Sequence, residues 1–166
     1  MDYLWSPWRM EYIKSEKTSN QCVFCEMLKQ NRDEEMLILA RGERAFIVLN
    51  RFPYNNGHLM VVPYVHKDSL NALDAETRFE MMELLNRVEK MLRKEYHPDG
   101  INMGVNIGAA AGAGVADHIH FHVVPRWSGD VNFMGSVALT RVLPEDLSQT
   151  YQRMLRAWKV MDSTGQ

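Results

Sequence analysis

Three histidines occupy every second position of the segment 118–125: His118, His120 and His122. Successive side chains of a β-strand alternate between its two faces, so this spacing predicts three imidazoles on one face. Ile119 and Phe121 would then face the core. A single histidine in a strand is usually structural, but three in strict alternation, backed by hydrophobic residues, indicate chemistry. Imidazoles in such a row either bind a metal or handle a phosphate or acyl group as nucleophile and acid.

Cys22 and Cys25 form a C-x-x-C pair, which by spacing alone fits redox chemistry, metal binding or no chemistry at all. A redox-active C-x-x-C pair normally follows a strand and begins a long helix in a βαβ pattern, and that pattern is missing here. Zinc needs four ligands, so two thiolates require two further donors. His66, just beyond the third predicted strand, and His118 complete a Cys2His2 site if their strands are neighbours. A closed site of this kind has no position for water and would be structural.

Residues 106–117 form a loop rich in glycine and alanine that ends directly before the histidines. A stretch of this composition is by itself usually a flexible linker. Next to three imidazoles we interpret it as a phosphate cradle, because small residues such as Gly112 and Gly114 let backbone N–H groups approach an anion closely. Asn106 could add a side-chain donor at the edge of this cradle.

The remaining residues must form the elements that position these groups. Apolar runs predict strands at 37–40, 45–49, 58–63, 101–107 and 118–125. A long helix is predicted within 68–96, with Asp74 as its N-cap. Its predicted core-facing side chains are Phe79, Met82, Leu85, Val88, Met91 and Leu92. Runs of strands joined by hairpin-length turns and followed by helices favour an α+β fold with an antiparallel sheet.

The length of 166 residues suits one domain, so we predict a single domain 1–166 with an N-terminal arm at 1–20 and a C-terminal helix at 143–160, capped by Asp146 or begun at Pro144. A formal net charge of −2 gives no support for non-specific nucleic-acid binding. Neither a signal peptide nor an apolar run of membrane-spanning length is visible, and two cysteines are too few for a secreted disulfide framework. We therefore predict a cytoplasmic protein that binds neither nucleic acid nor membrane.

The segment 118–124 matches the His-φ-His-φ-His-φ-φ signature (φ, hydrophobic) of the histidine-triad (HIT) superfamily, and the resemblance extends from Cys22 to Arg126. Residues 50–53 and 57–66 resemble the family's ribose-side loop and central strand. Segments 5–9, 110–114 and 124–133 are similar to its bacterial diadenosine tetraphosphate phosphorylase-like branch. The resemblance implies a HIT-like antiparallel sheet of about five strands with one long helix and a C-terminal helix, and a homodimer.

The same resemblance implies catalytic roles for two of the histidines. His120 would attack the α-phosphate and form a covalent nucleotidyl-histidine, which splits the reaction into two easier steps. His122 would contact the phosphate where charge develops. His58 would lie behind the triad, without contacting the substrate, and help to fix the orientation of the imidazoles. Asn50 matches the position that holds the ribose hydroxyls, although some relatives carry an acid there.

In zinc-containing relatives the metal is held by a C-x-x-C pair, a histidine after the central strand and the first histidine of the triad. By resemblance these ligands are Cys22, Cys25, His66 and His118, the four residues that the spacing also proposes. We therefore expect a structural Zn²⁺.

Two departures from the family pattern are visible. Many triad hydrolases carry a Gln-Ser or Gln-Thr pair just before the triad, where this chain has residues 114–117, so phosphate contacts must rest more on backbone groups and on Asn106. The related uridylyltransferases replace the third histidine by glutamine. His122 is intact, which argues against that branch.

The sequence thus predicts a nucleotide hydrolase or transferase that cleaves a dinucleoside polyphosphate through a nucleotidyl-histidine, with phosphate or water as acceptor and adenine nucleotides favoured. Two alternatives stay open. One is a zinc-dependent hydrolase in which the triad itself binds a catalytic metal, which would leave Cys22 and Cys25 without a role. The other is a nucleotide-binding partner protein with vestigial activity.

Overall fold

The computed structural model of the chain describes residues 21–130 and 145–164. The predicted N-terminal arm, the segments at 5–9 and 131–133, and the first residues of the predicted C-terminal helix lie outside these ranges. Among the described residues, none of the helices is long and apolar enough to cross a membrane.

Five antiparallel strands form one sheet in the order β1-β2-β3-β5-β4. Their bounds are Ile38–Arg41 (β1), Ala45–Leu49 (β2), Leu59–Pro63 (β3), Gly100–Val105 (β4) and Phe121–Arg126 (β5). Strands β2 and β3 are buried along their whole length, because both faces of the sheet are covered there. The predicted α+β class and five-stranded sheet are confirmed.

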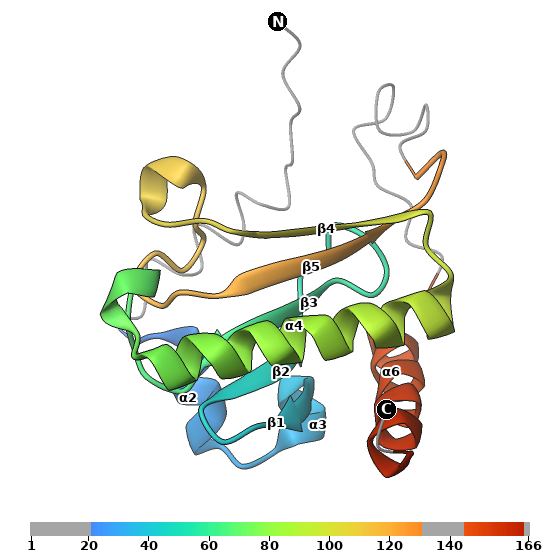
Figure 1. Cartoon of the computed structure of the whole chain (residues 1–166), viewed down its shortest axis with the longest axis horizontal. Coiled ribbons are helices and arrows are strands. Elements are labelled where there is room, and N and C mark those ends of the chain that lie inside the picture. The colour runs from blue at the N-terminus through green and yellow to red at the C-terminus, as the bar shows by residue number, and fades with distance from the viewer. Residues whose placement is uncertain (1–20, 131–144, 165–166) are drawn as a thin grey trace, which may run out of the picture.

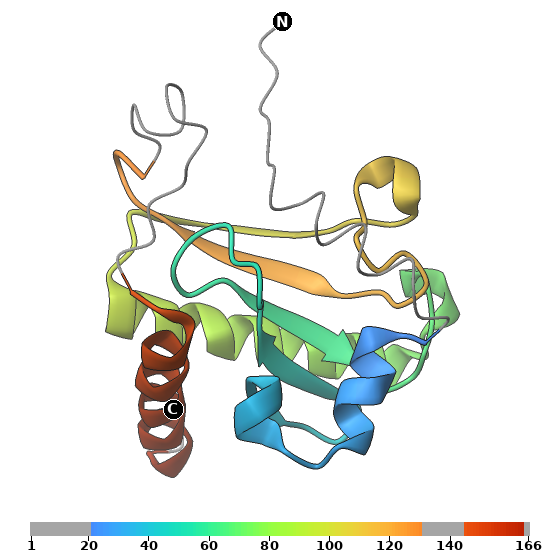
Figure 2. The same ribbon diagram turned by 180° about the vertical axis from the view of Figure 1, so that it is seen from behind.

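The helices lie on both sides of this sheet. Their bounds are Val23–Lys29 (α2), Asp33–Met36 (α3), Ala75–Tyr96 (α4) and Leu147–Ser163 (α6), with single 3-10 turns at Leu70–Ala72 and Ala109–Ala111. Helix α4 crosses one face of the sheet, and α2 lies against the other face (Figures 1 and 2). As predicted, Asp74 caps α4 by accepting a 2.7 Å hydrogen bond from the backbone N–H of Thr77, and Asp146 caps α6.

The core-facing side of α4 differs from the prediction. Phe79 and Met82 are exposed, with 69% and 58% of their surface accessible. The other four predicted residues, Leu85, Val88, Met91 and Leu92, are buried as expected, and Thr77, Met81 and Leu84 are buried beside them. The adjacent pair Met81 and Met82 offers two apolar stripes that differ by about 100° in direction. Only packing against the sheet selects between them, and it selects Met81.

Each face of the sheet has its own core. The larger core fills the space between the sheet, α4 and α6. The smaller core lies on the α2 side and contains Phe24, Ile38, Phe46, Val48, Met60 and Val62. The candidate functional residues gather around this smaller core.

Candidate functional site

The three histidines lie near one another but belong to two clusters. Strand β5 begins at Phe121, so His118 and His120 precede the regular strand that was predicted to start at 118. The reason is the end of β3 at Pro63: beyond it, the Ile119 N–H bonds the carbonyl oxygen of Lys67 in the following loop and not a strand. His118 turns toward the two cysteines, whereas the rings of His120 and His122 contact each other edge to face at 4.8 Å.

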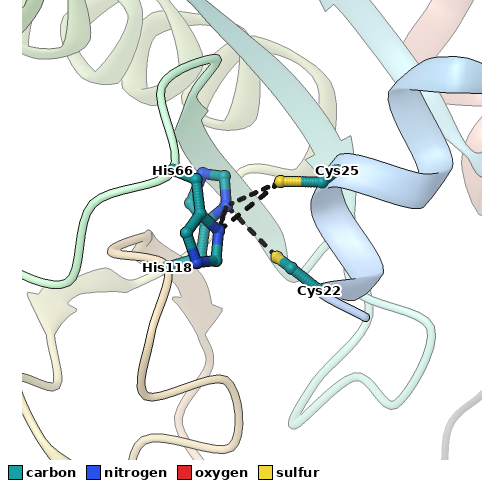
Figure 3. Close-up of side chains that lie close together, drawn as sticks. All are labelled: Cys22, Cys25, His66 and His118. Atoms are coloured by element: carbon teal, nitrogen blue, oxygen red, sulfur yellow. Dashed lines mark hydrogen bonds between the residues drawn. The ribbon is translucent and has the colours of Figure 1, made fainter. Parts of the chain in front are cut away.

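The first cluster consists of Cys22, Cys25, His66 and His118, whose ligand atoms all lie within 4.8 Å of one another. Figure 3 shows Cys22, directly before α2, and Cys25, within it, facing the two histidines, which come from the loop after β3 and the segment before β5. Nδ1 of His118 lies 3.3 Å from Sγ of Cys22 and 3.7 Å from Sγ of Cys25. Nδ1 of His66 lies 3.5 Å from Sγ of Cys25 and 3.3 Å from Nδ1 of His118.

The four separations of 3.3–3.7 Å that involve a histidine nitrogen fit a four-coordinate metal. In a tetrahedral zinc site with bonds of about 2.3 Å to sulfur and about 2.0 Å to nitrogen, neighbouring ligand atoms lie roughly 3.3–3.8 Å apart. The ring of His118 is also oriented for this role, because its Nε2–H donates a 2.9 Å hydrogen bond to the carbonyl oxygen of Pro63 and leaves the lone pair on Nδ1. Burial lowers the pKa of His118, which keeps it neutral, as a ligand must be. The cluster can therefore hold a metal ion.

The second cluster contains His120, whose backbone contact selects its tautomer. Nδ1 of His120 donates a 2.8 Å hydrogen bond to the carbonyl oxygen of His118, so the lone pair is on Nε2. The side chain is 4% exposed, and burial lowers its pKa. A neutral imidazole with an oriented lone pair is a competent nucleophile toward phosphorus.

The tautomer of His122 follows from a chain of hydrogen bonds that begins in the backbone. The Tyr54 N–H donates to Nδ1 of His58 at 3.0 Å, so the proton of His58 is on Nε2. That Nε2–H donates to Nδ1 of His122 at 2.9 Å, which puts the His122 proton on its own Nε2. His58 is fully buried. Asn50 lies beside this chain, with its amide nitrogen 3.4 Å from Nε2 of His58.

The two neighbouring rings therefore have complementary nitrogens: Nε2 of His120 is an acceptor and Nε2 of His122 is a donor. Both residues line a pocket of about 330 Å³. Its walls come from α2 and the residue after it, from α3, β2, β3, the loop after β2 and the Gly/Ala-rich loop. The lining residues are Val23, Phe24, Glu26, Met27, Gln30, Met36, Leu49, Asn50, Arg51, Phe52, Tyr54, Met60, Gly112 and Gly114. An apolar pocket with a few convergent polar groups is the usual form of a small-molecule site.

Most predicted site residues lie at one of the two clusters. Asn50, Gly112 and Gly114 line the pocket together with His120 and His122, whereas Asn106 is not among its lining residues. At Gly112 the backbone adopts a φ of +87°, which L side chains rarely adopt.

Sequence reasoning missed the apolar wall of the pocket, which includes Phe24, Met27 and Met36. One indication was available. A phenylalanine between two cysteines that are candidate metal ligands must pack near the predicted metal cluster, and Phe24 does so with its ring 5.3 Å from that of His118.

Comparisons with known proteins agree with this geometry. A HIT domain family model matches residues 31–129. The chain is 38% identical to AP-4-A phosphorylase from Mycobacterium tuberculosis over 163 residues, which is 93% of this chain and 83% of that protein. A Zn-bound histidine triad family protein from Mycobacterium smegmatis superposes with a TM-score of 0.70 at 28% identity, over 87% of this chain and 97% of that one. Diadenosine triphosphate hydrolase from Plasmodium falciparum shares the fold, with a TM-score of 0.61 at 16% identity over 80% of each chain.

Proposed function

Since this chain belongs to the HIT family, we propose that it is an enzyme that cleaves a dinucleoside polyphosphate such as diadenosine tetraphosphate. The similarity to AP-4-A phosphorylase supports this substrate class. The observation that carries the proposal is the pair of fixed tautomers at the pocket: a lone pair on His120 next to an N–H on His122.

The reaction has two steps. Nε2 of His120 attacks the α-phosphorus, and the bond from that phosphorus to the bridging oxygen breaks, so that ATP leaves and an adenylyl-histidine remains. The N–H of His122 stabilises the charge that develops on the phosphate oxygens. An acceptor then attacks the same phosphorus and the N–P bond breaks, which restores neutral His120. Phosphate as acceptor yields ADP, and water yields AMP.

Different walls of the pocket would contact different parts of the substrate. Gly112 and Gly114 approach the phosphates with their backbones, Asn50 lies on the ribose side, and the apolar wall from α2 and α3 receives the adenine. Asn106 remains a predicted hydrogen-bond donor to the phosphates.

The single-domain organisation, the homodimer and the cytoplasmic location also remain predictions.

For the four-ligand cluster we propose zinc as the metal, supported by its Cys2His2 donor set and by the Zn-bound relative. With all four positions filled by protein, zinc there supplies a cross-link and no activated water. The three triad imidazoles do not converge on one point: Nδ1 of His118 faces the cysteines and Nδ1 of His120 donates to a carbonyl. This arrangement counts against the alternative of a catalytic metal held by the triad.

Product analysis with diadenosine tetraphosphate tests the proposal. With phosphate present, ADP plus ATP indicates phosphorolysis, whereas AMP plus ATP indicates hydrolysis. Stable substrate under both conditions would refute the proposed activity.

Trapping of a radiolabelled adenylyl group tests the covalent step. The label should be absent from the His120→Ala variant, which should lose turnover while keeping its AMP affinity within about tenfold. The His122→Ala variant should react more slowly and still accumulate some label. Near-native turnover of His120→Ala would exclude the covalent mechanism.

A further inference from the structure

Helix α2 belongs to both clusters at once. It begins directly after Cys22 and contains Cys25, so it provides the two thiolates of the metal cluster (Figure 3). Its residues Phe24, Glu26 and Met27 also line the pocket. The helix lies before residue 31, where the match to the HIT domain begins. One wall of the pocket is therefore attached to the family's domain through the metal ligands.

The helix has few other means of holding its position. It is seven residues long, and isolated helices of two turns are not stable in water. Its N-cap residue, Cys22, makes no capping hydrogen bond through its side chain, and Phe24 is its one buried residue. The placement of α2 thus depends on the burial of Phe24, on the partly buried Met27 and Leu28, which pack against the smaller core, and on the contacts of the two cysteines.

Phe24 connects the two clusters physically. Its ring lies 5.3 Å from that of His118, a member of the metal cluster, and 5.0 Å from that of His120, the proposed nucleophile. A shift of α2 would move the apolar wall of the pocket and remove the ring that packs against His120.

We propose that α2 is a metal-tethered wall of the nucleotide pocket, so that zinc and nucleotide bind with positive coupling. Zinc on Cys22, Cys25, His66 and His118 holds α2 against the sheet, and the adenine then packs on Met27. The inference rests on the proposed function, because it assumes a nucleotide in this pocket. Thermodynamic linkage makes the coupling reciprocal: AMP must raise the affinity for zinc by the same factor as zinc raises the affinity for AMP.

The experiment measures the Kd of AMP by calorimetry for zinc-loaded protein and for protein stripped by a chelator, with far-UV circular dichroism on both. We expect AMP to bind at least about tenfold more weakly without zinc, or 1.4 kcal/mol. The circular dichroism should be nearly unchanged, because the sheet, α4 and α6 have their own core.

Two methionines of the same pocket provide a matched pair of variants. Met27 lies on α2, whereas Met36 lies on α3, inside the family match. Met27→Ala should weaken AMP binding to the zinc-loaded protein. It should have little further effect on the zinc-free protein, because loss of zinc has already moved α2, and Met27 with it, away from the pocket. Met36→Ala should weaken binding by the same factor in both forms. This non-additivity of Met27→Ala with zinc removal is the signature of coupling through α2.

Three outcomes would overturn the inference. AMP could bind equally well with and without zinc, or Met27→Ala could cost the same factor in both forms. Loss of the circular dichroism on zinc removal would mean that the metal holds the whole fold and not one wall. If the zinc-loaded wild type does not bind AMP at all, the proposed function itself fails, which is a different result from a failure of the coupling.

Discussion

The hydrogen-bonded chain from Tyr54 through His58 to His122 allows the two nitrogens of His58 to be tested separately. Nδ1 accepts the Tyr54 N–H, and Nε2 donates to His122. The side-chain oxygen of an asparagine can reach the position of Nδ1, and the amide nitrogen of a glutamine can reach that of Nε2. His58→Asn therefore keeps the acceptor and loses the donor, whereas His58→Gln keeps the donor and loses the acceptor.

The expected magnitudes follow from these two bonds. Without the donor from His58, His122 is no longer held in the tautomer with its proton on Nε2, and one buried hydrogen bond is worth about 1–1.5 kcal/mol. Since about 1.4 kcal/mol corresponds to tenfold in rate, kcat of His58→Asn should fall about tenfold, and that of His58→Gln less than about threefold. His58→Gln removes the acceptor of the Tyr54 N–H, which costs about 1–2 kcal/mol and lowers the Tm by roughly 2–8 °C.

The assay is kcat for diadenosine tetraphosphate, measured by nucleotide chromatography on folded protein well below the Tm of each variant. Turnover is the deciding quantity, because both substitutions also change the packing around a fully buried side chain. Equal kcat values for the two variants, or a larger loss for His58→Gln, would refute the proposed role of His58 in selecting the tautomer of His122.

Three further predictions concern metal, ligand and pH. Mass spectrometry of the purified protein should find close to one zinc ion per chain. The Cys22→Ser variant should lose this zinc, because only three of the four ligands remain. Wild-type protein purified without any metal would contradict the proposed zinc site. AMP at a hundred times its Kd should stabilise the native state by about 2.7 kcal/mol in a thermal shift experiment, and an unchanged Tm at millimolar AMP would count against the nucleotide pocket. Burial opposes ionisation of Glu145, but hydrogen bonds from Tyr96 at 2.7 Å and Thr150 at 2.8 Å, together with the Arg153 guanidinium at 3.4 Å, outweigh it and keep the pKa of Glu145 below its usual value. Because the pKa of Glu145 is lower in the folded than in the unfolded state, where it is about 4.3, the ionised carboxylate stabilises the fold above that pH, and this stabilisation is lost as pH falls through the folded pKa. In urea unfolding, Glu145→Gln should therefore lower the free energy of unfolding by about 1–3 kcal/mol at pH 7 and by progressively less below about pH 4. A loss of stability that does not depend on pH would contradict this.

Local patterns in the sequence were sufficient for the element order and for the metal cluster. Apolar runs predicted the five strands, the short turns between them predicted an antiparallel sheet, and Asp74 and Asp146 marked the starts of α4 and α6. The metal cluster could be predicted because zinc chemistry requires four donors of particular types, and few residues in this chain qualify. These features depend on residue type and spacing, which are properties of the chain alone.

The tertiary structure decided three features that spacing could not. It selected Met81 and not Met82 for the core of α4, because two adjacent apolar residues fit a helical period equally well. It divided a regular row of histidines between two clusters, since the partner segment of 118–120 is a loop beyond Pro63 and not a strand.

The third feature is the protonation pattern of the site. Which nitrogen of each imidazole carries the proton depends on backbone groups distant in sequence: the carbonyl oxygen of Pro63 for His118, and the N–H of Tyr54, acting through His58, for His122. The sequence by itself determined that histidines would be present at this site. Only the fold determined which of them can bind a metal, attack or donate, because a neutral imidazole has one donor and one acceptor, and its hydrogen-bond partners decide which nitrogen is which.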